Sequence, residues 1–177
     1  MLLLTGRIVG RFATWQVTVA AFICVVGCVA GLAWRRARLA GLDLLDSRGW
    51  YTPGEVAALF DALDRLDAGA RVVYAATALT IDMVFPVSYG LLLAALLFRL
   101  FRGGVPLYLL PLLLAFADVL ENTVIAVLAL SHGDEPSSLA WLAAAFTLTK
   151  TGLIVATLAA TIAGGMLWLW ARIRQSR

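Results

Sequence analysis

Ionisable side chains interrupt the long apolar stretches of this sequence. Asp82, Asp118, Glu121 and Lys150 lie inside such stretches, and Asn122 directly follows Glu121. An ionisable group at the centre of a bilayer costs roughly 2.5 to 3.5 kcal/mol, so these positions suggest a functional site. A neutral carboxyl beside an ionised one is what general acid/base catalysis requires. We therefore interpret Asp82, Asp118 and Glu121 as candidate acid/base residues.

Helical spacing places the polar side chains on shared faces. Residues three, four or seven positions apart lie on the same side of an α-helix. The sets with this spacing are Asp82 with Tyr89, Asp118 with Glu121 and Asn122, and Thr147 with Lys150, Thr157 and Thr161. Each face should point into a bundle interior. We expect Lys150 to be the charge partner of a carboxylate. Lys150, Asn122, Tyr89 and Thr147 are the residues expected to contact a bound substrate.

Depth along each helix brings the ionisable groups to one layer. At 1.5 Å per residue from the outer end of each span, Asp82 lies about 15 Å deep, Glu121 about 13 Å, Asp118 about 18 Å and Lys150 about 17 Å. The four groups should meet near the membrane midplane, with Lys150 as the only positive charge. Three carboxyls facing one ammonium cannot all be ionised there, so at least one should hold a proton.

Pro86 follows Asp82 by four residues on the same predicted helix. Proline has no backbone N–H, so the carbonyl of Asp82 should lack its usual helical partner.

The composition indicates an integral membrane protein. Hydrophobic residues make up 62% of the chain and charged residues 14%, and the mean hydropathy is +0.92. These values leave too little polar surface for a water-soluble globule. Stretches long enough to cross a hydrocarbon core of about 30 Å lie at about 12–34, 72–98, 106–130 and 139–170. We predict an all-α, polytopic four-helix bundle that forms a single domain over residues 1–177.

The first connection should contain a short amphipathic helix at about 53–67. Thr52, Pro53 and Glu55 have the spacing of a capping box with proline at the first helical position. Apolar residues then recur at helical spacing at Val56, Leu59, Phe60, Leu63 and Leu66. This helix should lie on the outer interface or cover the bundle, either as a simple connector or as a lid with Gly69 as its hinge.

Arginine placement predicts the orientation. Arginines follow the second and fourth spans, whereas the hairpin between the third and fourth spans carries His132, Asp134 and Glu135. The predicted cytoplasmic set is Arg99, Arg102, Arg172, Arg174 and Arg177. Both termini should therefore be cytoplasmic in a bacterial inner membrane. Arg35, Arg36 and Arg38 fall on the outside in this orientation, where six acidic residues from Asp43 to Asp67 offset them.

Other chemistries have little support in the sequence. It contains no glycine-rich phosphate loop, no serine nucleophile elbow and no CxxC pair. His132 is the only histidine, and its acidic neighbours lack metal-ligand spacing, so we expect no metal site and no cofactor. The net charge of +3 fits cytoplasmic arginine flanks and does not indicate nucleic-acid binding.

Several motifs from Tyr51 onward resemble a family of small uncharacterised bacterial four-span membrane proteins. They are Tyr51-Thr52-Pro53, Ala68-Gly69-Ala70-Arg71 with Tyr74, Asp82, Phe85-Pro86, Tyr89-Gly90, Leu110-Pro111, Asp118-Val119-Leu120-Glu121-Asn122, and Phe146-Thr147 with Lys150. This resemblance implies no known activity. Four spans, the extended first connection and an acidic residue before Phe85-Pro86 are also similar to the emopamil-binding and sigma-2 receptor group. That likeness implies a bundle that holds sterol-like or cationic amphiphilic ligands between membrane carboxylates.

Three functions agree with these observations. The first is a midplane pocket for an apolar or amphiphilic, lipid-like molecule, on which the carboxyls could act by proton transfer. The second is a proton- or ion-coupled transporter or channel subunit, which would be oligomeric because one four-span bundle leaves little room for a pathway. The third is a structural subunit whose buried charges only specify assembly. Membrane lipids are expected partners in every case, and the sequence does not decide whether the protein is an enzyme.

Overall fold

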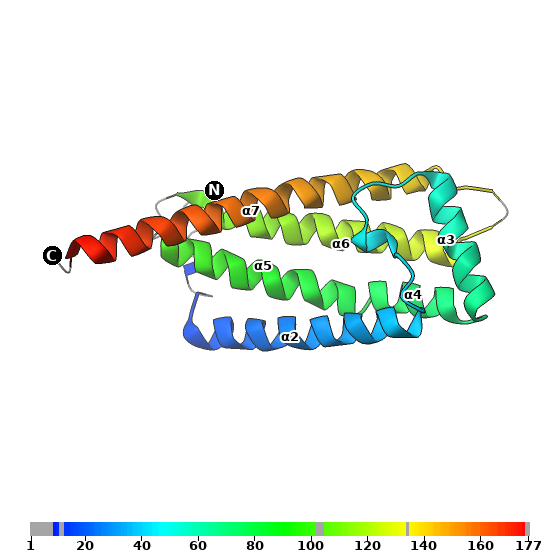
Figure 1. Ribbon diagram of the computed structural model, residues 1–177, viewed down its shortest axis with the longest axis horizontal. Coiled ribbons are helices and arrows are strands. Elements are labelled where there is room, and N and C mark those ends of the chain that lie inside the picture. The colour runs from blue at the N-terminus through cyan, green and yellow to red at the C-terminus, as the bar shows by residue number, and fades with distance from the viewer. Residues whose placement is uncertain (1–8, 11–12, 102–104, 134, 176–177) are drawn as a thin grey trace.

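The chain is helical in a computed structural model that describes residues 9–10, 13–101, 105–133 and 135–175. No β-strand occurs among these residues, so the predicted all-α class is confirmed. The elements are α2 (Trp15–Arg38), η1 (Leu45–Ser47), α3 (Pro53–Leu66), α4 (Ala70–Ala78), α5 (Ile81–Leu100), η2 (Pro106–Tyr108), α6 (Leu109–Leu130) and α7 (Leu139–Gln175). Figure 1 shows the four long helices side by side, with α3 across one end of the bundle.

Four helical stretches are long and apolar enough to cross a membrane. They are Trp15–Arg38, Ala70–Leu100, Pro106–Leu130 and Leu139–Gln175. The four predicted spans therefore exist, and the first and last continue four and five residues further than predicted, to Arg38 and Gln175. Phe12, the predicted start of the first span, and Arg102, Asp134 and Arg177, used for the orientation, lie outside the described residues.

The second span consists of two helices, whereas the sequence predicted one continuous helix over 72–98. The break at Leu79 and Thr80 separates α4 from α5. Thr80 Oγ1 donates to the carbonyl of Ala76 at 2.7 Å, and Thr77 Oγ1 donates to the carbonyl of Val73 at 2.9 Å. Threonine hydroxyls that bond back to the preceding turn bend helices, and two of them act on the last turn of α4.

Packing places α6 at the centre of the bundle. In its most apolar stretch of 18 residues, 56% of the residues are buried, compared with 11% in the corresponding stretches of α2 and α7. Helix α6 packs against α4, α5 and α7, while α2 lies mainly against α5. The residues of α2 that are buried are Ala21, Cys28 and Arg35, which are seven positions apart and form one stripe. The rest of α2 and α7 presents large apolar side chains outward, as lipid-facing helices do.

The amphipathic helix predicted at 53–67 is present as α3. Its capping box is formed: Thr52 N–H donates to Glu55 Oε2 at 2.7 Å, and Glu55 N–H donates to Thr52 Oγ1 at 3.4 Å. Thr52 Oγ1 also donates to Glu55 Oε2 at 2.8 Å, and this bond, together with the one from the Thr52 N–H, lowers the pKa of Glu55. The predicted apolar stripe is buried at Val56, Leu59, Phe60 and Leu63, but Leu66 at its end is 43% exposed. Helix α3 is therefore docked on the bundle.

The polar layer lies between two apolar clusters. The cluster at the α3 end of the bundle contains Leu45, Tyr51, Phe60, Leu63 and Tyr74, together with residues from the ends of α6 and α7. The cluster toward the other end is built around Ala94, Leu97 and Tyr108. The first connection contributes fully buried side chains to the cluster at the α3 end, so it is folded against the bundle. This position brings residues of the connection to the polar layer.

Gly90 allows α5 and α6 to approach closely. A Cβ atom at Gly90 would lie 2.7 Å from Ala115 Cβ and 3.2 Å from the carbonyl oxygen of Pro111. We expect Gly90→Ala to lower the free energy of unfolding by about 1 to 3 kcal/mol through overpacking. Gly152→Ala on α7 is the control, since its Cβ would meet nothing within 4 Å. Thermal unfolding in detergent measures both; equal midpoints would contradict the proposed close contact.

Candidate functional site

Arg35 is the partner of Asp82. Its Nη1 pairs with Asp82 Oδ2, and its Nη2 lies 2.6 Å from Asp46 Oδ2. Arg35 is only 4% exposed, although the sequence analysis placed it in the outer connection. Lys150 is therefore not the only positive charge of the buried layer, and that prediction was wrong. The available signal was the spacing of Arg35 from Ala21 and Cys28, which puts it on the inward stripe of α2.

Lys150 joins α7 to both acidic residues of α6. Its Nζ lies 3.3 Å from Asp118 Oδ1 and pairs with Glu121 Oε2. Glu121 is completely buried, and Thr147 Oγ1 donates to its Oε1 at 2.6 Å. The hydroxyls of Thr147 and Tyr51 are hydrogen-bonded at 3.2 Å. Burial raises the pKa of Tyr51 to about 12, so this hydroxyl keeps its proton at neutral pH.

Asn122 connects the two groups of charges. Its Nδ2 donates to the carbonyl oxygen of Asp82 at 2.6 Å and reaches Asp118 Oδ1 at 3.5 Å. Pro86 lies one turn after Asp82 in α5, so this carbonyl has no backbone N–H from position 86. The side chain of Asn122 supplies the missing donor. The expected free carbonyl is thus present, and it fixes α6 to α5 at the level of the carboxylates.

Asp46 of η1 completes the network from the connection between α2 and α3. Its Oδ2 binds Arg35, its Oδ1 accepts a hydrogen bond from Tyr74 at 3.4 Å, and its carbonyl accepts one from Lys150 at 3.4 Å. Sequence analysis treated Asp46 as one of six acidic loop residues and missed this role. No local pattern signals it, because the contact depends on how the connection folds back over the bundle.

The charge balance of the layer remains negative. Four carboxyls, those of Asp46, Asp82, Asp118 and Glu121, face two cations, Arg35 and Lys150, among the described ion pairs of the layer. The predicted ratio was three to one. Full ionisation would still leave an excess of two negative charges in a site of low dielectric. The expectation that at least one carboxyl holds a proton therefore remains a prediction for this larger set.

Some of the predicted site residues line a groove beside the charged layer, and others do not. This groove lies between α5, α6 and α7 and has a volume of about 370 Å³. Its polar wall contains Asp46, Tyr89, Asp118, Lys150 and Thr157, and its apolar wall Phe85, Leu93, Leu114, Ile154 and Leu158. The four that do not line it are Asp82, Glu121, Asn122 and Thr147. Glu121 and Asn122 contact residues of its polar wall, Lys150 and Asp118.

Two hydroxyls are placed at the polar wall of the groove. Tyr89 donates to Asp118 Oδ2 at 2.8 Å, so both oxygens of Asp118 are engaged. Thr157 is 1% exposed, and its Oγ1 has no hydrogen-bond partner. An unpaired buried hydroxyl costs about 1 to 3 kcal/mol, so a polar group of a bound molecule at this position would be stabilising.

His132 has a structural partner. Its Nε2 lies 2.9 Å from Asp61 Oδ1, and its ring meets Phe60 edge-on with centroids 5.3 Å apart. These contacts connect the hairpin after α6 to α3. Within the described residues, no group of three His, Cys, Asp or Glu side chains has an arrangement that could hold a metal ion.

Comparison with known proteins gives no further guide to function: the chain matches no protein-family model, no curated protein and no solved structure.

Proposed function

We propose that this protein binds an apolar or amphiphilic, lipid-like molecule in the groove between α5, α6 and α7, within a bacterial inner membrane. The observation that carries the proposal is the contrast between the two walls of the groove. One wall is apolar, and the other ends on Asp118, Lys150 and the unpaired Thr157 hydroxyl. Such a cleft suits a ligand with an apolar body and one polar group.

Asp118 is the best placed of the three candidate acid/base residues for proton transfer to a ligand in the groove. It lines the groove, whereas Asp82 and Glu121 do not. Tyr89 and Lys150 hold its two oxygens and would orient the carboxyl toward a reacting group. Glu121 would then set the charge that Asp118 experiences through Lys150. Asn122, held by the backbone carbonyl of Asp82, would help to position the Asp118 carboxyl. This arrangement agrees with the ligand site implied by the resemblance to the emopamil-binding group.

The test is to fill the groove with a large side chain. Leu158→Trp places an indole on the apolar wall, and Leu148→Trp is a matched control on the same helix, since the two leucines are 54% and 51% exposed and only Leu158 lines the groove. Untargeted mass spectrometry of solvent extracts should find a molecule enriched with the wild-type protein. We expect its amount to fall at least fivefold in Leu158→Trp and to stay unchanged in Leu148→Trp. A fivefold fall corresponds to a loss of about 1 kcal/mol of binding free energy.

The same experiment can contradict the proposal. Equal retention of the molecule in both variants would place its binding site elsewhere. Equal loss in both would show a general effect of the added indole on lipid contacts.

Proton-coupled transport is the second candidate, because the polar network is continuous. Asp46 of the connection contacts Lys150, which contacts Glu121 and Asp118 within the bundle. A chain of titratable groups of this kind can relay protons. Proton uptake into vesicles that contain the protein, abolished by Asp118→Asn, would favour this function over ligand binding alone.

We also infer that both termini are cytoplasmic. Arg99 lies in the last turn of α5, and Arg172 and Arg174 lie in the last turn of α7. Arg35 lies on the outer side in this orientation, but its charge is neutralised by Asp46 and Asp82. Of the other outer arginines, Arg48 and Arg71 pair with Asp43 and Asp64. The remaining three, Arg36, Arg38 and Arg65, are fewer than the seven arginines on the cytoplasmic side, which are Arg7, Arg11, Arg99, Arg102, Arg172, Arg174 and Arg177.

A further inference from the structure

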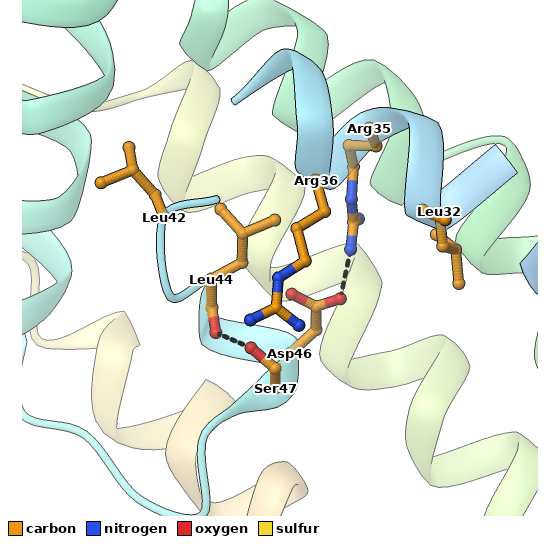
Figure 2. Close-up of a pocket in the computed structure, with 8 residues that line it drawn as sticks. Leu32, Arg35, Arg36, Leu42, Leu44, Asp46 and Ser47 are labelled. Carbon is orange, nitrogen blue, oxygen red and sulfur yellow. Dashed lines mark hydrogen bonds and ion pairs between the residues drawn. The ribbon is translucent and has the colours of Figure 1, made fainter. Parts of the chain in front are cut away.

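A second cavity lies at the end of α2, between this helix and the turn that leads to η1. Its volume is about 310 Å³. The apolar part of the wall comes from Leu32, Leu42 and Leu44, and the charged part from Arg35, Arg36 and Asp46. Figure 2 shows the side chains of Arg35 and Arg36 extending from α2 toward Asp46. This cavity and the groove proposed to bind the amphiphile share Asp46 and no other lining residue.

Arg36 takes no part in the ion pairs at the cavity. The guanidinium of Arg36 has no ion pair or hydrogen bond within the described part of the chain. Both carboxylates nearest to Arg35, those of Asp46 and Asp82, are already paired with it. The oxygens of Asp46 are engaged by Arg35 and Tyr74. Arg36 is therefore free to bind an anion at the mouth of the cavity.

A second unpaired donor belongs to Arg35, which also lines the cavity. The Nε of Arg35 is buried and has no hydrogen-bond partner, although Nη1 and Nη2 of the same guanidinium both have carboxylate partners. A buried N–H group without a partner is rare, because it keeps the cost of desolvation with no compensating bond. An anion oxygen in the cavity would supply that partner and would sit between two adjacent arginines.

The position of the cavity indicates where the anion comes from. Arg35 and Arg36 lie in the last turn of a membrane-spanning helix, next to Trp34, which is 56% exposed. Exposed tryptophans at helix ends lie at the level of lipid headgroups. Leu32, one turn before Arg36 on α2, provides an apolar surface on the membrane side of the arginines, and Leu42 and Leu44 of the following turn complete the apolar wall. A ligand with a phosphate above an apolar chain matches both features.

We propose that this cavity binds the phosphodiester group of a membrane phospholipid. Arg36 is the main cation, Arg35 Nε is the second donor, and the acyl chain follows Leu32 toward the surrounding bilayer. The bound headgroup covers the turn between α2 and η1. Because Asp46 also borders the other groove, phospholipid binding holds this turn in place beside the buried charges.

The test uses the full chain, stripped of lipid in dodecyl maltoside, and native mass spectrometry. The probes are phosphatidylglycerol, a diacylglycerol with the same chains, and inorganic phosphate. We expect phosphatidylglycerol to bind, and Arg36→Gln to raise its Kd about tenfold, because a charge-assisted contact is lost. Ala33→Phe, which narrows the cavity without changing its charge, should also raise the Kd several-fold.

Arg38→Gln is the matched control, because it removes the same charge from the same turn of α2 outside the cavity. Its Kd should stay within twofold of the wild-type value. The proposal is overturned if Arg36→Gln and Arg38→Gln weaken binding equally, or if the diacylglycerol binds as well as the phospholipid. Displacement of the lipid by equimolar inorganic phosphate would assign the site to a free anion and overturn the lipid assignment.

Discussion

Replacing Lys150 by methionine should lower the free energy of unfolding by on the order of 3 to 5 kcal/mol. Lys150 is 8% exposed and contacts Asp118 and Glu121, which are themselves buried. Methionine nearly conserves the length of the side chain but removes the charge. Two buried carboxyls then lose their only ammonium partner, and Glu121 keeps just the hydroxyl of Thr147. Thermal or denaturant unfolding in detergent measures the loss.

Double mutants identify which carboxyl depends on Lys150. Glu121→Gln combined with Lys150→Met should recover much of the lost stability, because the uncompensated charge is removed. Asp82→Asn should give no such recovery, because Asp82 is paired with Arg35. The ion pairs therefore make Glu121, and not Asp82, the position for this test. Recovery by Asp82→Asn and not by Glu121→Gln would contradict the ion pairs described above.

The same mutants separate a structural role from a ligand site. If the charges only hold helices together, Lys150→Met should be unstable and the double mutant with Glu121→Gln should regain stability and all its properties. If Lys150 also contacts a ligand, the double mutant should regain stability but not the co-purified molecule, since Lys150 lines the groove. A stable Lys150→Met protein with unchanged ligand content would exclude both roles for this residue.

Local patterns were enough to predict the four apolar spans and helix α3. The four spans follow from the lengths of the apolar stretches, and α3 follows from the Thr52–Glu55 capping box and the spacing of Val56 and Phe60. The break between α4 and α5 was missed, because it depends on hydroxyl bonds of Thr77 and Thr80 that compete with the helix. Such competition alters a helix without changing its hydropathy.

The contacts of the polar layer were only partly predictable. The spacing of polar residues on α6 and α7 correctly indicated a common inward face for Asp118, Glu121 and Lys150. Arg35 and Asp46 were missed for another reason: their contacts join segments whose relative position is set by tertiary folding. Arg35 pairs with a residue 47 positions away, across α2 and α5. The roles assigned to Tyr89, Asn122 and Thr147 toward a substrate stay predictions.

Replacing Arg35 by methionine should also lower the free energy of unfolding by on the order of 3 to 5 kcal/mol, because it leaves Asp46 and Asp82 without their cation. A second effect should be specific to this residue. Asp46 would lose the ion pair that holds η1 on the bundle, so the connection should open more often. Trypsin cleavage after Arg48, in the same connection, measures this opening at a temperature where the variant is still folded.

Arg38→Met is the matched control for Arg35→Met, since Arg38 is an exposed arginine of the same helical turn whose guanidinium lies over the ring of Trp34. It should change stability by less than about 0.5 kcal/mol and leave cleavage after Arg48 unchanged. Adding Asp82→Asn to Arg35→Met should restore part of the stability but not the protection of Arg48, because Asp46 still lacks its partner. Unchanged cleavage in Arg35→Met would instead show that the buried side chains of Leu44, Leu45 and Tyr51 hold the connection without the ion pair.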